Sequence, residues 1–361
     1  MPEPRVPALL AGRGFPEYAA ISPDQVREQI PLLLSRLSDQ FTALEAELDA
    51  ALEAGTPLSW ETVMPPLHQL GEQLRWSWGV VTHLNAVCNT PELREAHAAQ
   101  QADVVRFSNR LGQSRSLHRA LEALDQHPSH PLDQTQQRIL AAELLSMHQR
   151  GVGLTGEIQA AFNTASERLA ELSTLFGNHV LDATQAWYLV LHDPARVAGL
   201  PERALEALAA AARKAGDRHV DGGEANAEHG PWRLGLDMPS YLPVLTHADD
   251  RQLRETLYRA HVSRASSGDL DNTPLIAEIL ELRQQQAQRL GHAHWAELSL
   301  AGKMAEDVPA VEALLEELRA AAYPTACAEL RELRDCARRH GAPEADALAP
   351  WDVSYWAEKL R

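Results

Sequence analysis

Residues 22–48 read SPDQVREQIPLLLSRLSDQFTALEAEL, and this stretch carries the pattern that decides the fold class. Ser22 stands where a helix N-cap belongs, and Pro23 falls in the first turn, where proline is tolerated. Apolar side chains then recur at steps of three and four residues, which places them on one face of a helix. They are Val26, Ile30, Leu33, Leu37, Phe41, Leu44 and Leu48. The pattern predicts a long amphipathic helix that ends near Gly55-Thr56-Pro57.

The same periodicity continues along most of the chain, so we expect a mainly α fold. Two short apolar and β-prone runs, 187–191 and 232–236, predict a small β element near residues 180–245. Further helices are expected at 60–88, 93–124, 132–150, 157–175, 200–214, 251–264, 273–290, 308–322 and 325–340.

Length and charge limit the possible functions. A chain of 361 residues is long enough for about two domains. Its 33 basic and 50 acidic residues give a net charge of −17, which argues against nucleic acid or anionic lipid as a partner. No stretch has the ~18 apolar residues of a membrane span, and residues 1–22 do not resemble a signal peptide. We expect a soluble protein of the cytoplasm with no membrane partner.

The most conspicuous motif is Gly151-Val152-Gly153-Leu154-Thr155-Gly156, which has the spacing of a dinucleotide-binding loop. That chemistry requires a strand before the glycines, so that the pyrophosphate meets a helix N-terminus. Here a helix precedes them. We therefore interpret residues 151–156 as a turn between two helices, with Gly151 just past the end of the first.

The 16 histidines do not form a recognisable metal site. A HExxH zinc motif needs two histidines four residues apart, and no pair in this sequence has that spacing. His292 and His294 with Glu297 are the densest group, and a polar connector is the ordinary explanation for them. His68 with Glu72, and His192 with Asp193, are interpreted as local polar pairs. These three assignments leave no metal ligand in the sequence.

Nucleophilic motifs are also missing, since neither a GxSxG elbow nor a P-loop occurs. Cys88 is expected to pack on an apolar helix face. Cys327 and Cys336 lie about 13 Å apart along one expected helix, which is too far for a disulfide. The Arg75-Trp76-Ser77-Trp78 stretch is interpreted as core aromatic packing. The sequence thus offers no catalytic, cofactor-binding or metal-binding residue.

Residues 350–361 begin a helix at Pro350 that stops after about two turns and contains two tryptophans. We expect this helix to present Trp351 and Trp356 on apolar surface that something outside the chain covers. The alternative is a short terminal helix that docks on the chain itself.

Several strings together resemble one family over nearly the whole chain. They are HLNAV (83–87), NTPELR (89–94), GVGL (151–154), ERLAEL (167–172), VLDAT (180–184), AGLPE (198–202), DMPSYLPV (237–244), LRETLYRA (253–260), RAS (264–266), DNTPLI (271–276), ELSLAGKMA (297–305) and PWD (350–352). The family is that of the oligopeptidase A and thimet-oligopeptidase-like zinc metallopeptidases, family M3.

This resemblance implies a two-lobed, mostly helical hydrolase with a channel that admits short peptides. It also implies zinc, held by HExxH and a later glutamate, and metal-activated water as the nucleophile. None of those residues has a counterpart here, because the sequence ends about halfway along the family's length. We therefore expect an N-terminal fragment that is inactive alone, with a complementary C-terminal peptidase half as its partner.

The expected organisation has four parts. Residues 1–21 form an N-terminal extension and 22–150 a helical domain. Residues 151–245 hold a helix pair and the small β element, and 246–361 begin the peptidase domain, truncated before the zinc motif. Two other hypotheses remain open: a non-catalytic helical peptide-binding or adaptor protein, and a non-functional remnant that folds poorly.

Overall fold

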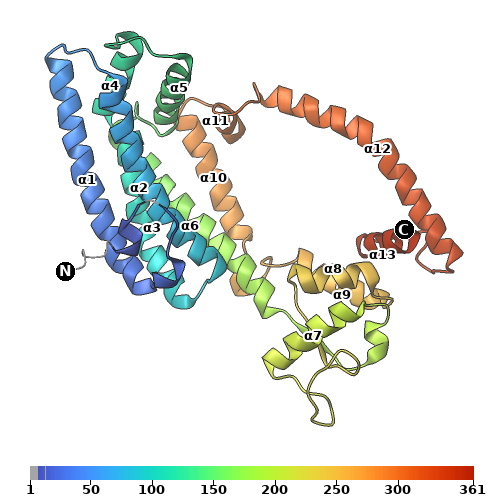
Figure 1. The fold of residues 1–361 in the computed structure, drawn as a ribbon. Helices are drawn as coiled ribbons and strands as arrows, with labels where there is room; N and C mark the ends of the chain where they lie inside the picture. The colour runs from blue at the N-terminus through green and yellow to red at the C-terminus, as the bar shows by residue number, and fades with distance from the viewer. Residues whose placement is uncertain (1–6, 13) are drawn as a thin grey trace. The chain divides into compact units, whose positions relative to one another are not determined.

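A computed structural model describes residues 7–12 and 14–361 of the chain, so part of the expected N-terminal extension lies outside the described residues. The fold is mainly α-helical with one small antiparallel sheet, as the sequence predicts (Figure 1). Two compact units can be distinguished: residues up to 174 together with 278–308, and residues 175–277 together with 309–361. The division into four parts stays a prediction.

The elements follow one another in a simple order along the chain. They are η1 (Ala8–Leu10), η2 (Tyr18–Ala20), α1 (Pro23–Glu53), α2 (Trp60–Val87), α3 (Pro91–Gly112), α4 (Arg115–Gln126), α5 (Gln134–Gln149), α6 (Gly156–Ala186), β1 (Leu189–Leu191), η3 (Pro194–Val197), α7 (Glu202–Ala215), β2 (Trp232–Leu234), α8 (Met238–His247), α9 (Arg251–Val262), η4 (Gly268–Leu270), α10 (Thr273–Arg289), α11 (Trp295–Leu300), α12 (Val308–Arg339) and α13 (Pro350–Leu360). Within the described residues, none of these helices is both long and apolar enough to cross a bilayer.

Helix α1 forms as its sequence predicts. The Ser22 hydroxyl accepts a hydrogen bond from the Gln25 backbone N–H, and the Gln25 side chain accepts one from the Ser22 N–H, which completes a capping box. The seven apolar residues at steps of three and four are all buried. They pack against α2, α3 and α4 and form the core of the first unit.

Three helix boundaries differ from the sequence prediction. Helix α6 runs to Ala186, eleven residues past the expected end at 175. The expected helix 93–124 is broken after Gly112, because the Ser114 hydroxyl accepts from the Leu117 N–H and starts α4 as a separate helix. The expected break near Pro324 was wrong. Helix α12 runs through that proline as one continuous element.

Two helices were missed. Helix α8 begins where we expected only a strand ending, because Asp237 accepts from the Ser240 N–H and Pro239 fits the first turn. Helix α11 is a short element capped by His294.

The second unit is built on the small sheet and the helices beside it. Strands β1 and β2 pair antiparallel, with Leu191 opposite Trp232. Trp232 is fully buried and packs with apolar residues of α7, α8 and α9.

Helix α13 docks on α8 and α9 of the same unit. Trp351 and Trp356 are both buried there, so the expectation that they await an outside cover was wrong and the alternative of a docked terminal helix is correct. The physical reason is the polar cluster beneath the helix, which the apolar pattern of residues 350–361 does not reveal.

That polar cluster is centred on Arg254 of α9, which is 1% exposed. Its Nη2 donates to Asp352 Oδ1 over 3.1 Å, its Nη1 to the Ala248 carbonyl over 2.7 Å, and its Nε to the Trp351 carbonyl over 3.2 Å. Arg251 adds a second guanidinium, with its Nη2 2.8 Å from Asp352 Oδ2. The carboxylate therefore joins two successive turns of α9 to the start of α13.

Burial raises the pKa of the Asp352 carboxyl, but hydrogen bonds outweigh it. The donors are Arg251, the Ala349 backbone N–H and Arg254, and together they hold the pKa of Asp352 below its ordinary value. The same contacts raise the pKa of the Arg251 guanidinium, with Asp352 as the main cause. Both shifts favour the ion pair.

Candidate functional site

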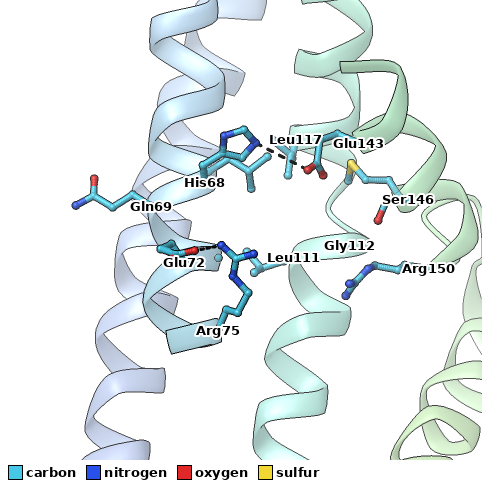
Figure 2. Close-up of a pocket in the computed structure, with 13 residues that line it drawn as sticks. His68, Gln69, Glu72, Arg75, Leu111, Gly112, Leu117, Glu143, Ser146 and Arg150 are labelled. Carbon is cyan, nitrogen blue, oxygen red and sulfur yellow. Dashed lines mark hydrogen bonds and ion pairs between the residues drawn. The ribbon is translucent and has the colours of Figure 1, made fainter. Parts of the chain in front are cut away.

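A cavity of about 770 Å³ lies in the first unit, and its volume is within the ~300–1,000 Å³ typical of small-molecule sites. It is bounded by α2, the end of α3, α4 and α5 (Figure 2). Its lining comprises Leu67, His68, Gln69, Gly71, Glu72, Arg75, Leu111, Gly112, Leu117, Glu143, Ser146, Met147 and Arg150. No residue of the second unit contributes to it.

The cavity has an apolar floor and a polar rim. Leu117 and Met147 are almost fully buried, whereas the side chain of Arg75 is 79% exposed. Figure 2 shows the Arg75 guanidinium projecting from α2 and the Arg150 side chain extending from the end of α5 into the same space. A ligand in this space would therefore contact both hydrocarbon and charge.

The ion pairs of the rim differ from those expected from sequence. We expected His68 to pair with Glu72, but His68 Nε2 lies 3.9 Å from Glu143 Oε1 on α5. Glu72 instead pairs with Arg75, one turn further along α2 (Figure 2). Helical spacing allows Glu72 to pair with either His68 or Arg75. The position of Glu143 on α5, which faces His68, decides between the two.

Arg150 is positioned by its surroundings. Its backbone carbonyl accepts from Gln113 Nε2 over 2.8 Å, and its Nη1 donates to the Ser108 carbonyl over 3.4 Å. The absence of a side chain at Gly112 makes room for it, because a Cβ there would lie 2.2 Å from Arg150 Cδ. Three residues of α3 and its C-cap thus set where this guanidinium lies.

The glycine motif 151–156 is a turn between helices, as predicted. Arg150 caps α5, Gly151 follows with φ at +83°, and α6 begins at Gly156. A helix precedes the motif, so it lacks the strand that a dinucleotide site requires.

The histidine cluster serves the start of α11. His294 Nδ1 accepts from the Glu297 N–H, and Glu297 Oε2 accepts from the Ala293 N–H over 2.8 Å, so both side chains bind backbone N–H groups at the start of the helix. His294 Nε2 lies 3.7 Å from Glu297 Oε1. This is the polar connector that the sequence predicts.

Asp193, expected to pair with His192, instead accepts from the Ala195 N–H and caps η3. Throughout residues 7–12 and 14–361, no three His, Cys, Asp or Glu side chains are grouped so that they could hold a metal ion. The residues that the structure describes therefore do not fit the zinc that the family resemblance implies.

The remaining candidates are structural. Cys88 is exposed at the end of α2, so the expectation that it packs in the core was wrong; the helix ends there and turns it toward solvent. Cys327 and Cys336 are free, as predicted. Trp76 and Trp78 pack against the core of the first unit, which confirms the interpretation of that stretch as aromatic packing.

Sequence reasoning missed the cavity altogether. Its lining comes from four consecutive helices, and no local motif links the lining residues. The one usable signal was Gly112, a glycine at the end of an otherwise regular helical pattern, which can mark a close approach of another segment.

Comparison with known proteins covers both ends of the described fold. Residues 30–159 match the family "Neurolysin/Thimet oligopeptidase, N-terminal domain", and residues 244–361 match "Peptidase family M3". The first match falls on the unit that holds the cavity.

Similar full-length proteins extend the match to nearly the whole chain. "Probable cytosolic oligopeptidase A" of Arabidopsis thaliana is 40% identical over 354 residues, covering 98% of this chain and 48% of the relative. "Oligopeptidase A" of Salmonella typhimurium and of Escherichia coli are 36% and 35% identical over 359 residues, each covering 98% of this chain and 50% of the relative. The chain spans about half the length of the curated relatives it matches. It belongs to peptidase family M3, within the oligopeptidase A-like group.

Proposed function

We propose that this chain forms part of a peptidase that hydrolyses short peptides with a zinc ion, and that it contributes scaffold rather than the catalytic residues. The observation that supports this proposal is similarity over 98% of the chain to proteins named oligopeptidase A. A cytoplasmic location is part of the proposal, and one of those relatives is named cytosolic.

The side chains present indicate why we assign scaffold to this chain and the catalytic residues to another polypeptide. The sequence contains no pair of histidines four residues apart, and the described residues hold no metal-binding group of side chains. The zinc ligands, the general base and any oxyanion-stabilising group would come from a complementary peptidase half. No catalytic step is assigned to residues of this chain.

Co-expression tests this proposal. The chain is purified alone and together with a polypeptide, encoded by a neighbouring reading frame, that carries HExxH. We expect cleavage of a quenched fluorescent short peptide, and one zinc per complex by elemental analysis, only in the mixture. A matched control replaces the glutamate of HExxH by glutamine, which should abolish cleavage while the complex still forms.

Two results would contradict the proposal. Zinc retained by the isolated chain through dialysis, together with cleavage, would show that this chain is itself the enzyme. Halves that associate and bind zinc but stay inert would remove the catalytic assignment and favour the alternative of a peptide-binding or adaptor protein. A chain without a cooperative melt would instead favour the non-functional remnant.

A further inference from the structure

The 770 Å³ cavity of the first unit has charges arranged for a particular kind of ligand. We propose that it binds a small zwitterion, an amino acid or a short peptide with free amino and carboxyl ends. Arg75 and Arg150 would take the carboxylate and Glu143 the ammonium. The proposal concerns binding alone and does not rest on the proposed peptidase function.

The cationic end of the cavity is formed by two guanidinium groups from different helices. Arg75 projects from α2 and Arg150 from the end of α5 (Figure 2). The one hydrogen bond recorded for the Arg150 guanidinium in the described structure joins Nη1 to the Ser108 carbonyl, which leaves the Nε and Nη2 donors for a ligand. Guanidinium groups bind carboxylates with paired, charge-assisted hydrogen bonds. This end therefore suits a carboxylate.

The anionic end is formed by Glu143 of α5, whereas Arg75 projects from α2. Its contact with His68 is 3.9 Å long, which exceeds hydrogen-bond distance. The carboxylate oxygens therefore keep acceptor capacity that an ammonium group can use. A ligand ammonium would gain a charge-assisted hydrogen bond that the histidine does not provide at this distance.

The overall charge of the lining favours a ligand with no net charge. Two arginines, Arg75 and Arg150, are balanced by two glutamates, Glu72 and Glu143. A free phosphate would gain from the arginines but has no ammonium group for Glu143 to bind. A zwitterion satisfies both ends at once.

The floor between the charged ends is apolar and suits an aliphatic side chain. Leu67, Leu111, Leu117 and Met147 supply it, and Leu117 and Met147 are almost fully buried. Burial of hydrocarbon against such a surface contributes affinity in proportion to the area covered. Leucine-containing dipeptides combine all three features.

The test is isothermal titration of the full chain with the dipeptide leucyl-leucine, beside its N-acetylated form, its C-amidated form and inorganic phosphate. We expect the unblocked dipeptide to bind and each blocked form to bind at least about tenfold more weakly, the factor for losing one charge-assisted hydrogen bond. Phosphate that binds as tightly as the dipeptide, or blocked forms that match it, would overturn the proposal. So would the absence of binding at about 10 mM dipeptide.

Substitutions of lining residues test whether the dipeptide binds in this cavity. Arg150→Gln and Glu143→Gln should each weaken dipeptide binding by about tenfold or more. Arg138→Gln, an exposed arginine on α5 that does not line the cavity, should change binding by less than about twofold. Equal effects of Arg150→Gln and Arg138→Gln would overturn the assignment.

A further variant keeps every charge and moves only one of them. Gly112→Ala puts a Cβ 2.2 Å from Arg150 Cδ, so the arginine side chain must shift. We expect weakened dipeptide binding with an unchanged far-ultraviolet dichroism spectrum. If neither Gly112→Ala nor Arg150→Gln changed the affinity for the dipeptide, the cavity would not be its binding site.

Discussion

Arg254 and Asp352 form an ion pair across 98 residues of sequence, with a guanidinium Nη2 3.1 Å from a carboxylate Oδ1 and both side chains closed to solvent. Asp352 also accepts from Arg251 and from the Ala349 N–H. A buried charge is tolerated only when it is paired and hydrogen-bonded. This pair therefore fixes helix α13 on helix α9.

Removal of the buried carboxylate should be costly. Asp352→Ala leaves the buried Arg254 without its hydrogen-bonded carboxylate and with only the 4.0 Å ion pair to Glu344, and we expect the free energy of unfolding to fall by about 3–5 kcal/mol. The measurement is urea unfolding followed by tryptophan fluorescence. The matched control is Asp346→Ala, which breaks the exposed pair with Arg338 in the same unit and should leave stability almost unchanged. Equal losses in the two variants would contradict a special role for the buried pair.

The contribution of Asp352 should depend on pH. Its pKa in the folded protein lies below its ordinary value of 3.8, because Arg251, Ala349 and Arg254 hydrogen-bond the ionised form. The unfolded chain therefore binds the proton first as pH falls, so the stabilisation is complete above about pH 5 and is lost through the lower folded pKa. The stability difference between the wild type and Asp352→Asn should shrink from neutral pH to about pH 3. A constant difference would contradict this.

His97 should destabilise the first unit in mild acid. Burial lowers its pKa, because the charged imidazolium would lose its hydration, and the ring stacks on Trp78 with 4.6 Å between centroids. The unfolded chain takes up a proton near the ordinary pKa of 6.5, whereas the folded chain resists it. Stability should thus fall between about pH 7 and about pH 5.5, and less steeply in His97→Phe. Parallel pH profiles of the two proteins would refute this.

Pro324 should weaken the middle of α12. Proline has no N–H to donate to the Ala320 carbonyl, and its ring crowds the preceding turn. Pro324→Ala should stabilise this stretch locally by up to about 3 kcal/mol, measured as slower amide hydrogen exchange in residues around 320–328. Pro309→Ala is the matched control, because Pro309 lies in the first turn, where a proline costs little. Faster exchange in Pro324→Ala would contradict the prediction.

Local pattern predicted most helices because each needs only its own residues. The periodic apolar face of α1 and its Ser22–Gln25 capping box are complete within a few turns. The prediction failed where one residue is compatible with two different local structures. Pro324 can end a helix or lie within one, and Asp237 can end a strand or cap the helix that follows.

The sequence by itself determined the mainly α fold, the small antiparallel sheet, the glycine turn at 151–156, and membership of a peptidase family, because those features depend on spacing along the chain. Only the tertiary structure decided that Glu143 faces His68, that Gly112 makes room for Arg150, and that α13 buries its tryptophans by docking on α8 and α9. Each of those outcomes joins residues tens of positions apart. Which surfaces meet at such separations is set by the packing of whole helices, and no periodicity within one helix encodes it.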